Sequence, residues 1–534
     1  MSTTRPAGQT MSTFSEQFGD DVMGELTMFD RMVFKGHLSA FFPKGAFKAF
    51  LDKQGVLLKG FKDFVQRATA DIAKHAETVA ERARRPFIRK AEQFTVNKGK
   101  SKEAMAAEIA RADGVREGLI CVMSALEPCM SFNVRGNWKT HQLEAVRAPR
   151  KCLHYYFYFI DPELGLLHVR LQSWFPMEIQ IWMNGREWLA RQLDKRGIAY
   201  ERHENSLLRI GDVKLAQELC TKFAHRKWPR LLDALAARVN PWIGRIRGTG
   251  FGSYYWVLDQ FEIATDIMFK DRPTLRALMP DLYEHAILEF GAENVMRFLG
   301  RKPHGAFKGE VITDLKKRPE GWRVKHSLKC NSIKMYDKWS VLRIETTINK
   351  PNEFRILRTV KQGGSSKWRW VPMTKGVANM WGYYEAGICA NNRYLSALAA
   401  VQPRGKALEE LDDLCRTKTI NGRRCPRLIP IEAHAVALFA AVMAGEHHIV
   451  GFRNADIAAR LFPGHSTLED TKRHCAFISR RISTLRARGL VAKKPNSRCY
   501  RVTPKGAAIM GTAIRLRKKE IPQELRVPAR LPAL

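Results

Sequence analysis

Apolar positions along this chain repeat with two different periods, and the change between them divides the sequence into regions. Residues 23–115 carry apolar residues at helical spacing in a stretch rich in Ala, Lys and Arg, which predicts a basic helical region. Residues 116–415 mix strand-like and helical patterns and predict an α+β central body. Residues 431–515 predict three helices and a β-hairpin. The remaining segments are polar or basic and predict a disordered leader at 1–22, a linker at 416–430 and a basic tail at 516–534.

The clearest strand signals are two hairpins in the central body. Residues 152–160 and 166–175 are rich in aromatic and β-branched residues and are joined by a turn sequence, which predicts antiparallel strands. Residues 333–348 predict a second hairpin, because apolar and polar residues alternate along its second strand. The pattern therefore predicts an α+β fold with an antiparallel sheet, and it shows no internal repeat. Helices are predicted at 176–193 and within 212–300 and 374–415.

The net charge narrows the class of partner. The chain has 90 Lys and Arg against 53 Asp and Glu, a formal net charge of +37. A polyanion stabilises so basic a protein, because binding relieves self-repulsion and releases counterions. The basic residues are dispersed over most of the length, so we expect a charged surface or channel that binds DNA or RNA. The first hairpin also offers candidates for stacking on single-stranded bases, and alternation should leave about half of them exposed. The candidates are Tyr155, Tyr156, Phe157, Tyr158, His168, Arg170 and Trp174.

Other features argue against whole classes of protein. No apolar run is long enough to cross a membrane, and the N-terminus lacks the apolar segment of a secretory signal, so we expect no membrane contact and a cytoplasmic location. The ten cysteines form no CxxC pair and predict buried thiols rather than disulfides or zinc fingers. The absence of GxxxxGK[ST], GxSxG and HExxH argues against a P-loop ATPase, an α/β-hydrolase and a zinc protease.

The best-defined motif lies in residues 431–515. Helices at 432–446, 455–462 and 468–489 are followed by a basic turn and a short strand, an order that predicts a winged helix-turn-helix. The segment LRARGLVAKKPNSRCYRVTPKG resembles the recognition-helix and wing segment of the MarR-like winged-helix family. The resemblance extends over roughly 80 residues and implies that this module contacts duplex DNA.

The third helix of this module has one apolar face. Successive residues are about 100° apart, so Ile478, Ile482 and Leu485 share a face that should be core. The opposite side would face the major groove, and the wing tip would reach the backbone or the minor groove. The alternative is a winged helix that contacts only protein. The candidate nucleic-acid-binding residues are Arg473, Arg480, Thr484, Arg488, Lys493, Lys494 and Arg498.

Two groups of carboxylates are candidate catalytic residues. The segment YYWVLDQFEIATDIMF predicts a helix with an apolar stripe, and Asp259, Glu262 and Asp266 lie almost opposite that stripe. Asp337 and Glu345 are predicted to share the polar face of the second hairpin. Mg²⁺ held by such carboxylates is what metal-dependent nucleases and strand-transfer enzymes require. The alternatives are pairing with nearby arginines and a cross-strand salt bridge.

Two further resemblances concern function. The pattern YDK…LRIE in the second hairpin is similar to a short pattern in the single-strand replication initiators of phage and plasmid elements. Those enzymes also need a His-hydrophobic-His metal pair and a catalytic Tyr, and this sequence contains no HxH. Over most of its body, including EGLICVMSALEPC and IKMYDKWSVLRIETTIN, the chain resembles a family of uncharacterised bacterial proteins that often occur in many copies per genome. That resemblance implies a mobile-element protein and carries no catalytic assignment.

Two functional hypotheses follow from these patterns. In the first, the chain is a nucleic-acid-binding enzyme of a mobile element, a Mg²⁺-dependent nuclease or transposase-like strand transferase that uses the carboxylates above. In the second, it is a non-enzymatic binder of DNA or RNA, either a ribonucleoprotein component or a winged-helix transcription regulator. Both hypotheses place duplex DNA at the C-terminal module.

Overall fold

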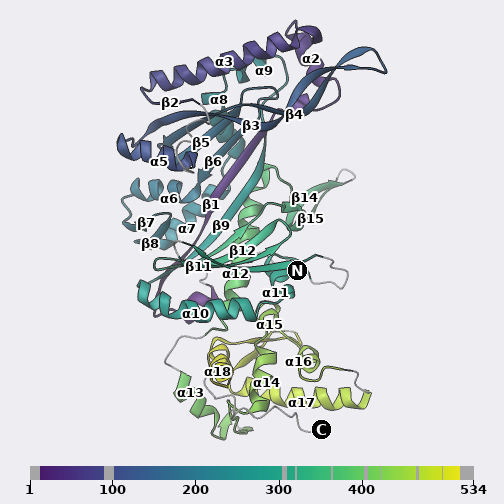
Figure 1. Cartoon of the computed structure of the whole chain (residues 1–534). Helices are drawn as coiled ribbons and strands as arrows, with labels where there is room; N and C mark the ends of the chain where they lie inside the picture. Colours follow the sequence, from purple (N-terminus) through teal and green to yellow (C-terminus); the bar gives the residue numbers. More distant parts are fainter. Residues whose placement is uncertain are drawn as a thin grey trace.

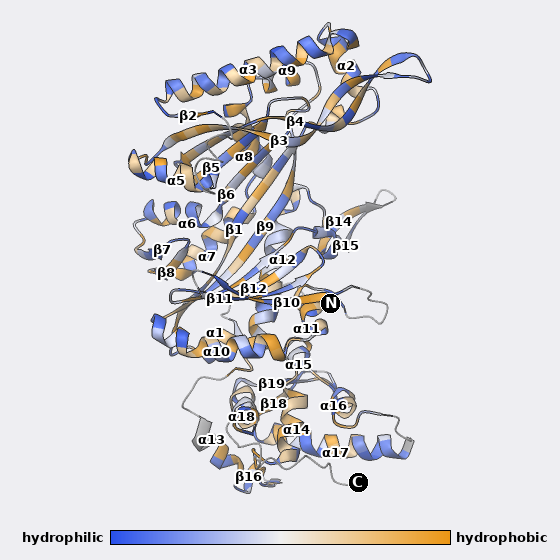
Figure 2. Cartoon of the chain, in the orientation of Figure 1, coloured by the Kyte–Doolittle hydropathy of each residue, from blue (hydrophilic) through white to orange (hydrophobic). Residues whose placement is uncertain are grey.

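The structure is a computed structural model that describes residues 12–89, 101–302, 309–318, 321–362, 365–401, 407–420, 423–464, 468–495 and 497–517. Its largest element is a sheet of eleven strands among these residues (Figure 1). Along their length the strands alternate between hydrophobic and hydrophilic residues (Figure 2). The predicted α+β fold class is confirmed.

In the first half of the sheet, the chain begins with a long strand, β1, and the last strand of this half pairs with it. Its strands are β1 (Val22–His37), β2 (Phe87–Ile88), β3 (Gly118–Asn137), β4 (Gln142–Asp161), β5 (Gly165–Gln172) and β6 (Ile179–Asn184). Between β1 and β3, the described residues form the α-helices α2 (Ala46–Lys53), α3 (Phe61–Arg82) and α5 (Lys102–Ala112). Strands β3 to β6 form an antiparallel meander, and β6 then pairs with β1.

The second half repeats this plan. Its strands are β9 (Tyr255–Phe269), β10 (Val311–Arg318), β11 (Gly321–Leu328), β12 (Asn331–Lys338) and β13 (Val341–Thr347). The helices α10 (Arg272–Leu288) and α11 (Ala292–Phe298) separate β9 from β10. Strands β10 to β13 again form an antiparallel meander, and β13 pairs with β9.

The two halves meet where β1 pairs antiparallel with β9. The full strand order is therefore β10-β11-β12-β13-β9-β1-β6-β5-β4-β3-β2, with only the short β2 running parallel to its neighbour among the described strands. At this junction the hydroxyls of Thr27 and Thr265 lie 2.9 Å apart. The internal repeat is thus one of strand order, which the residue pattern did not reveal.

Further elements connect or follow the two halves. Helix α1 (Thr13–Gln17) precedes β1, and 3₁₀ turns occur at Ser39–Phe41, Leu58–Gly60, Pro351–Glu353 and Val377–Asn379. After β6 come α6 (Gly185–Asp194), β7 (Tyr200–His203), β8 (Ser206–Ile210), α7 (Val213–Ala224), α8 (Trp228–Val239) and α9 (Ile243–Gly248). After β13 come β14 (Arg355–Gln362), β15 (Ser365–Pro372) and α12 (Met380–Leu398). Helix α7 packs on β1, and α12 packs on β9 and β13.

Aromatic side chains fill the main core between the sheet and these helices. The ring of Phe29 on β1 contacts Phe223 of α7, Phe261 of β9 and Tyr384 of α12. Such rings bury a large apolar area and prefer the edge-to-face contacts seen here. This core extends in sequence from Phe14 to Val401. The predicted basic helical region and the predicted central body therefore share one core.

The C-terminal module has a core of its own. Its elements are α13 (Ala407–Leu414), β16 (Lys418–Ile420), β17 (Arg423–Cys425), α14 (Ala433–Val442), α15 (Gly445–Val450), α16 (Asn454–Leu461), α17 (Leu468–Ala487), β18 (Val491–Lys493), β19 (Tyr500–Val502) and α18 (Pro504–Arg515). Helices α14, α16 and α17 followed by the β18–β19 hairpin are the elements that the sequence predicts. The predicted linker instead contributes the short β16–β17 hairpin. The predicted tail from 518 onward lies outside the described residues.

The N-terminal prediction is wrong in two places. Residues 22–37 form strand β1 rather than helix. The leader, as far as the structure describes it, is ordered, because α1 buries Phe14 completely and Phe18 almost completely. The leader's first residues, 1–11, lie outside the described part of the chain.

Two other segments predicted to be helical form strands, one over its whole length and one in its first part. Residues 255–269 form the central strand β9, which is buried on both faces. Because buried residues follow one another along the second part of this strand, its apolar residues do not alternate strictly and can match a helical stripe by chance. Within the predicted helix 176–193, the first part forms β6 and the helix α6 begins only at Gly185. The alternation of Ile179, Ile181 and Met183 with more polar residues is the period-two signal of that strand. Among the described residues, no helix is long and apolar enough to cross a membrane.

Candidate functional site

Charged side chains cross the sheet at the junction of its two halves. Residues paired between antiparallel strands point to the same face. Asp266 pairs with Arg343, and Glu345 pairs with Lys334, so the register places all four side chains on one face. Glu262 reaches the same face because it pairs with Thr347, two residues from Glu345. Charged side chains of β9, β12 and β13 therefore lie together on one face of the sheet.

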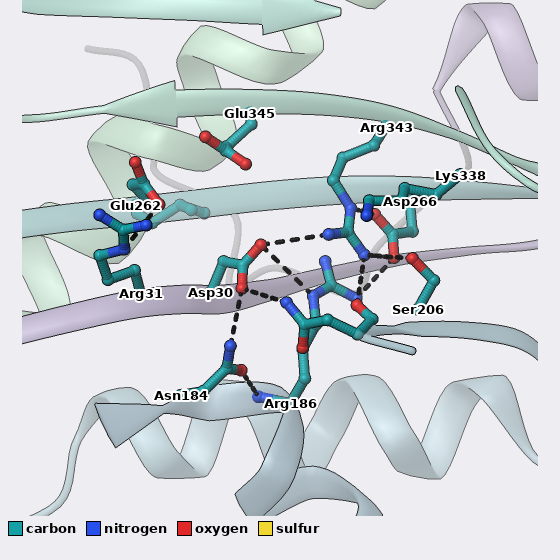
Figure 3. A network of polar contacts seen from close by, with 12 residues as sticks. Asp30, Arg31, Asn184, Arg186, Ser206, Glu262, Asp266, Lys338, Arg343 and Glu345 are labelled. Carbon is teal, nitrogen blue, oxygen red and sulfur yellow. Dashed lines mark hydrogen bonds and ion pairs between the residues drawn. The ribbon is translucent and has the colours of Figure 1, made fainter. Parts of the chain in front are cut away.

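The most buried part of this face is a network that we call the arginine–aspartate network: Asp30, Asp266, Arg186 and Arg343 (Figure 3). Arg343 donates two parallel hydrogen bonds to Asp266, at 2.7 and 2.9 Å, and a third at 3.2 Å to Asp30. Arg186 donates at 2.5 Å to Asp266. Each half of the sheet supplies one aspartate to each arginine. The network therefore joins the two halves by ion pairs.

Polar neighbours complete this network. The amides of Asn184 and Asn205 donate to Asp30 at 3.0 and 2.8 Å, and Arg343 donates to the hydroxyl of Ser206 at 2.8 Å. Burial works to raise the pKa of Asp30, but the charges of Arg343 and Arg186 and these hydrogen bonds outweigh it and hold the pKa below its usual value. Asp30 and Asp266 are thus occupied by cationic partners, which assigns this network a structural role.

A second group of ions lies beside the network and is less enclosed. We call Glu262 and Glu345 the acidic pair. The ammonium of Lys334 lies between them, 3.2 Å from Glu262 and in closer contact with Glu345. The Tyr336 hydroxyl donates to Glu345 at 2.6 Å, and the Arg31 guanidinium lies 3.7 Å from Glu262. Figure 3 shows both glutamates on one side of the arginine–aspartate network.

The protonation of this group follows from burial and from its charges. Burial and the charge of Glu345 raise the pKa of Glu262. Burial works to lower the pKa of Lys334, but Glu345 and Glu262 outweigh it, so the ammonium stays charged. Burial and the charge of Glu345 raise the pKa of Tyr336 well above its usual value, which keeps the hydroxyl a donor. The acidic pair therefore holds a monovalent cation, Lys334, where two carboxylates converge.

The other predicted carboxylates lie elsewhere. Asp259 pairs with Lys35 at 2.9 Å on a partly exposed part of β1 and β9. The β1–β9 register shifts at this point, with Val33 paired to Gln260 and Phe34 to Leu258, so Asp259 is the extra residue of a β-bulge and is engaged by Lys35 rather than by the acidic pair. Asp337 pairs in register with Leu342 and accepts a hydrogen bond from Tyr283 at 3.2 Å. The prediction that Asp337 shares a face with Glu345 is therefore wrong.

Of the five candidate catalytic carboxylates, Glu262 and Glu345 are thus the two that converge on one cation, Lys334, outside the arginine–aspartate network. Sequence reasoning missed Asp30, Arg186 and Lys334. Lys334 alternates with apolar residues in the predicted hairpin, a signal that could have been used. Asp30 lay in a segment predicted to be helical. Within the described residues, the group of three or more candidate ligand side chains with ligand atoms within 4.8 Å of one another is Cys129, Cys152 and His154.

In the C-terminal module, Ile478, Ile482 and Leu485 of α17 are buried as expected. Arg473 and Arg480 are exposed, and Arg473 lies 3.6 Å from Glu469. Thr484 is half-buried and its hydroxyl donates to the Arg480 carbonyl at 3.2 Å.

The prediction that Arg488 faces outward is wrong. It follows the last residue of α17, so helical angles no longer apply to it. Its guanidinium is buried and donates to three backbone carbonyls, those of Asp413, Arg416 and Pro426, at 2.6–3.1 Å. Arg488 therefore fastens the end of α17 to the segment before α14.

A basic hollow lies at the β18–β19 hairpin. Four cationic side chains line it, together with Pro495 and Ser497: Arg486, Lys493, Lys494 and Arg498. Three of the four are predicted wing residues, and Arg486 at the end of α17 is the one that the sequence reasoning missed. Clustered cations in a concave surface attract phosphate groups.

Two hairpins carry exposed tryptophans beside cations. Residues 366–370 of β15, the sequence SKWRW, are all exposed, with Trp368 at 69% and Trp370 at 61%. In register the two tryptophans share one face of the β14–β15 hairpin, and Lys367 and Arg369 share the other. Trp138, at the tip of the β3–β4 hairpin, is 79% exposed, and the Lys139 ammonium lies 5.2 Å from its ring. Both hairpins project from the same side of the molecule in Figure 1.

The aromatic residues that the sequence offered for base stacking are mostly core. Tyr155, Tyr156, Phe157 and Tyr158 are all buried, as is His168. Strands β4 and β5 are covered on both faces, by the main core and by α5. Alternation therefore does not expose half of this set, and that prediction is wrong.

Comparisons of this chain with protein-family models, with curated proteins and with solved structures give no match.

Proposed function

We propose that this chain is a nucleic-acid-binding protein whose body contacts single-stranded DNA or RNA through its projecting hairpins. The observation that carries the proposal is the SKWRW strand of the β14–β15 hairpin. Two exposed indole rings on one face offer stacking surfaces for bases, and the cations on the other face offer contacts for phosphates. Neighbouring exposed apolar side chains on one face mark interaction sites more often than single ones do. The net charge of +37 supports the same class of partner.

For the C-terminal module we propose a winged helix-turn-helix that docks on duplex DNA. Its support is the order of α14, α16, α17 and the β18–β19 hairpin, the exposed Arg473 and Arg480, and the basic hollow. Arg480 would face the major groove, while Lys493, Lys494 and Arg498 would contact the backbone or minor groove. A cytoplasmic location and a mobile-element role belong to the same proposal and rest on sequence alone.

A second candidate function is Mg²⁺-dependent strand cleavage or transfer at the acidic pair. The observation that favours it is the convergence of Glu262 and Glu345 beside Lys334 and Arg31. Mg²⁺ is commonly held by one or two carboxylates together with substrate phosphates. A bound phosphate could draw Lys334 away and leave both carboxylates to the metal. The rival is a non-enzymatic binder, in which Lys334 only neutralises the pair.

One series of gel-shift reactions tests both candidates. Labelled single-stranded DNA, duplex DNA and RNA are each mixed with the full chain in EDTA or in Mg²⁺. We expect the double variant Trp368→Ala/Trp370→Ala to bind single strands at least tenfold more weakly, since each stacked base contributes about 1–3 kcal/mol. Leu288→Ala, an equally exposed apolar residue on α10, is the control and should bind normally. Equal affinity of the double variant and the control would overturn the stacking proposal.

The same reactions report on catalysis. Products that form only in Mg²⁺ and disappear in both Glu262→Gln and Glu345→Gln, with binding retained, would support the acidic pair as a metal centre. Asp259→Asn is the matched carboxylate control and should cleave as the unchanged protein does. Intact substrate in every lane would favour the non-enzymatic binder, and cleavage that survives both glutamine variants would remove the acidic pair from consideration.

A further inference from the structure

Three side chains that can ligate a metal meet on β3 and β4, in the first half of the sheet, and the strands β5, β6 and β1 separate them from the acidic pair on β9 and β13. In the β3–β4 register, Cys152 pairs with Glu127, and Cys129 pairs with the residue two positions before Cys152. Cys129 and Cys152 are therefore diagonal neighbours on one face, and His154 follows on the same face. The two sulfur atoms lie 3.0 Å apart. The ligand atoms of all three residues lie within 4.8 Å of one another.

We propose that Cys129, Cys152 and His154 bind one zinc ion. Two thiolates and an imidazole nitrogen are a typical zinc donor set, with Zn–S near 2.3 Å and Zn–N near 2.0 Å. In a tetrahedral site two thiolate sulfurs are about 3.8 Å apart. The sulfurs must therefore separate by less than about 1 Å, which small side-chain rotations achieve without a change in the strands. Binding releases one proton from each thiol, and the two thiolates balance the charge of Zn²⁺.

The surroundings orient the histidine. The Nδ1 atom of His154 lies 3.2 Å from the carbonyl oxygen of Cys152. A carbonyl only accepts, so Nδ1 carries the hydrogen and the lone pair remains on Nε2 for a metal. This backbone contact is the usual way in which proteins orient a ligating histidine. His154 and Cys152 are buried, whereas Cys129 is half-buried, which leaves a path for the ion and a fourth position for water or another ligand.

Neighbouring charges neither fill nor block the site. Glu127 is held by Arg170 and Lys102, each at 2.8 Å, so its carboxylate is committed to cations. The Arg150 guanidinium stacks over the ring of Trp174 at 3.6 Å. With Glu127 committed elsewhere, the available donors are two thiolates and an imidazole, and these favour zinc over magnesium.

Metal analysis of the full chain, purified in reducing buffer with zinc and then freed of loose metal, tests the proposal. We expect about one zinc per chain. Cys152→Ser and His154→Gln should lose most of it. Cys330→Ser, which removes an exposed cysteine on another part of the sheet, should keep it. Unchanged zinc in the first two variants would overturn the assignment.

A readout on the unchanged sequence guards against variants that fail to fold. Co²⁺ is added to the zinc-free wild-type chain, and the absorption of a tetrahedral cobalt–thiolate centre is recorded. Intense thiolate bands that zinc then abolishes support the site. A chain with all ten thiols titratable and no such bands overturns it, as does a mapped Cys129–Cys152 disulfide that persists in reducing buffer.

Discussion

At the residue scale, the two ion groups on the sheet face differ in how they are balanced. In the arginine–aspartate network, two aspartates meet two arginines in a site sealed from water, so every charge has a partner. Removing one member leaves the others buried and unpaired, which costs far more than the loss of a surface pair. In the acidic pair, Lys334 serves both carboxylates, and the second cation, Arg31, is about half exposed and lies 3.7 Å from Glu262, so the charges of this group are less tightly paired.

Asp266→Asn tests the balance of the network. The amide keeps the shape of the side chain but leaves Arg186 and Arg343 facing each other with one carboxylate fewer. We expect the free energy of unfolding to fall by about 3–5 kcal/mol in urea, followed by tryptophan fluorescence. Asp259→Asn breaks a partly exposed pair with Lys35 and should cost no more than about 1 kcal/mol. If the two variants unfolded at the same urea concentration, the network would have no stabilising role.

At the element scale, local patterns predicted the elements that one residue period describes. The β4–β5 hairpin is rich in aromatic and β-branched residues around a turn, apolar and polar residue types alternate along β13, and α17 carries a clear apolar stripe, so all were predicted. Strand β9 was not, because both of its faces are buried and its period is lost. Asp30 and Arg343 are 313 residues apart and meet only because β1 pairs with β9. The residue types alone marked Glu262 and Glu345 as candidates. Their neighbours become known only from the pairing of strands that are far apart in the sequence.

His326 links three elements and gives the fold a pH dependence. Its ring contacts Thr313 of β10 at 2.9 Å and Tyr394 of α12 at 3.0 Å. Burial lowers the pKa of His326 to about 4, whereas the unfolded chain binds the proton near 6.5. The stabilising effect is therefore complete above pH 6.5 and is lost as the pH falls toward 4, because the unfolded state takes up the proton first.

We expect His326 to contribute up to about 1.4 kcal/mol per pH unit to the slope of stability between pH 6.5 and 4. His326→Gln should unfold with a slope shallower by that amount, measured by urea unfolding at a series of pH values. His141→Gln, at the exposed tip of the β3–β4 hairpin, should keep the slope of the unchanged chain. An identical slope in both variants would mean that folding does not lower the pKa of His326.

At the scale of the whole molecule, two hydrophobic cores divide the chain between Val401 and Leu411. The contacts across this division include α15 against α11 and α12 and an ion pair between Arg515 and Asp281 at 3.9 Å. An ion pair at this distance couples two cores only weakly, and the two hydrophobic clusters themselves share no buried residue. The sequence placed the boundary later, in the linker at 416–430, because it could not show that α13 packs with the C-terminal helices.

Two separate cores should unfold as two calorimetric transitions. Ile482→Ala empties part of the C-terminal core and should lower only one transition, by roughly 10 °C or more. Ile263→Ala makes the same change in the main core and should lower only the other. A single transition that both variants lower equally would show that the two cores unfold together.

The repeated strand order has a consequence for symmetry. Two copies of one half, paired along their first strands, would form a dimer in which each side chain occurs twice in equivalent surroundings. A single chain that contains both halves is free of that constraint. One half can hold two cysteines and a histidine while the other holds two glutamates and a lysine. Because both halves belong to one chain, the cysteine–histidine cluster and the acidic pair are present in a one-to-one ratio at any protein concentration.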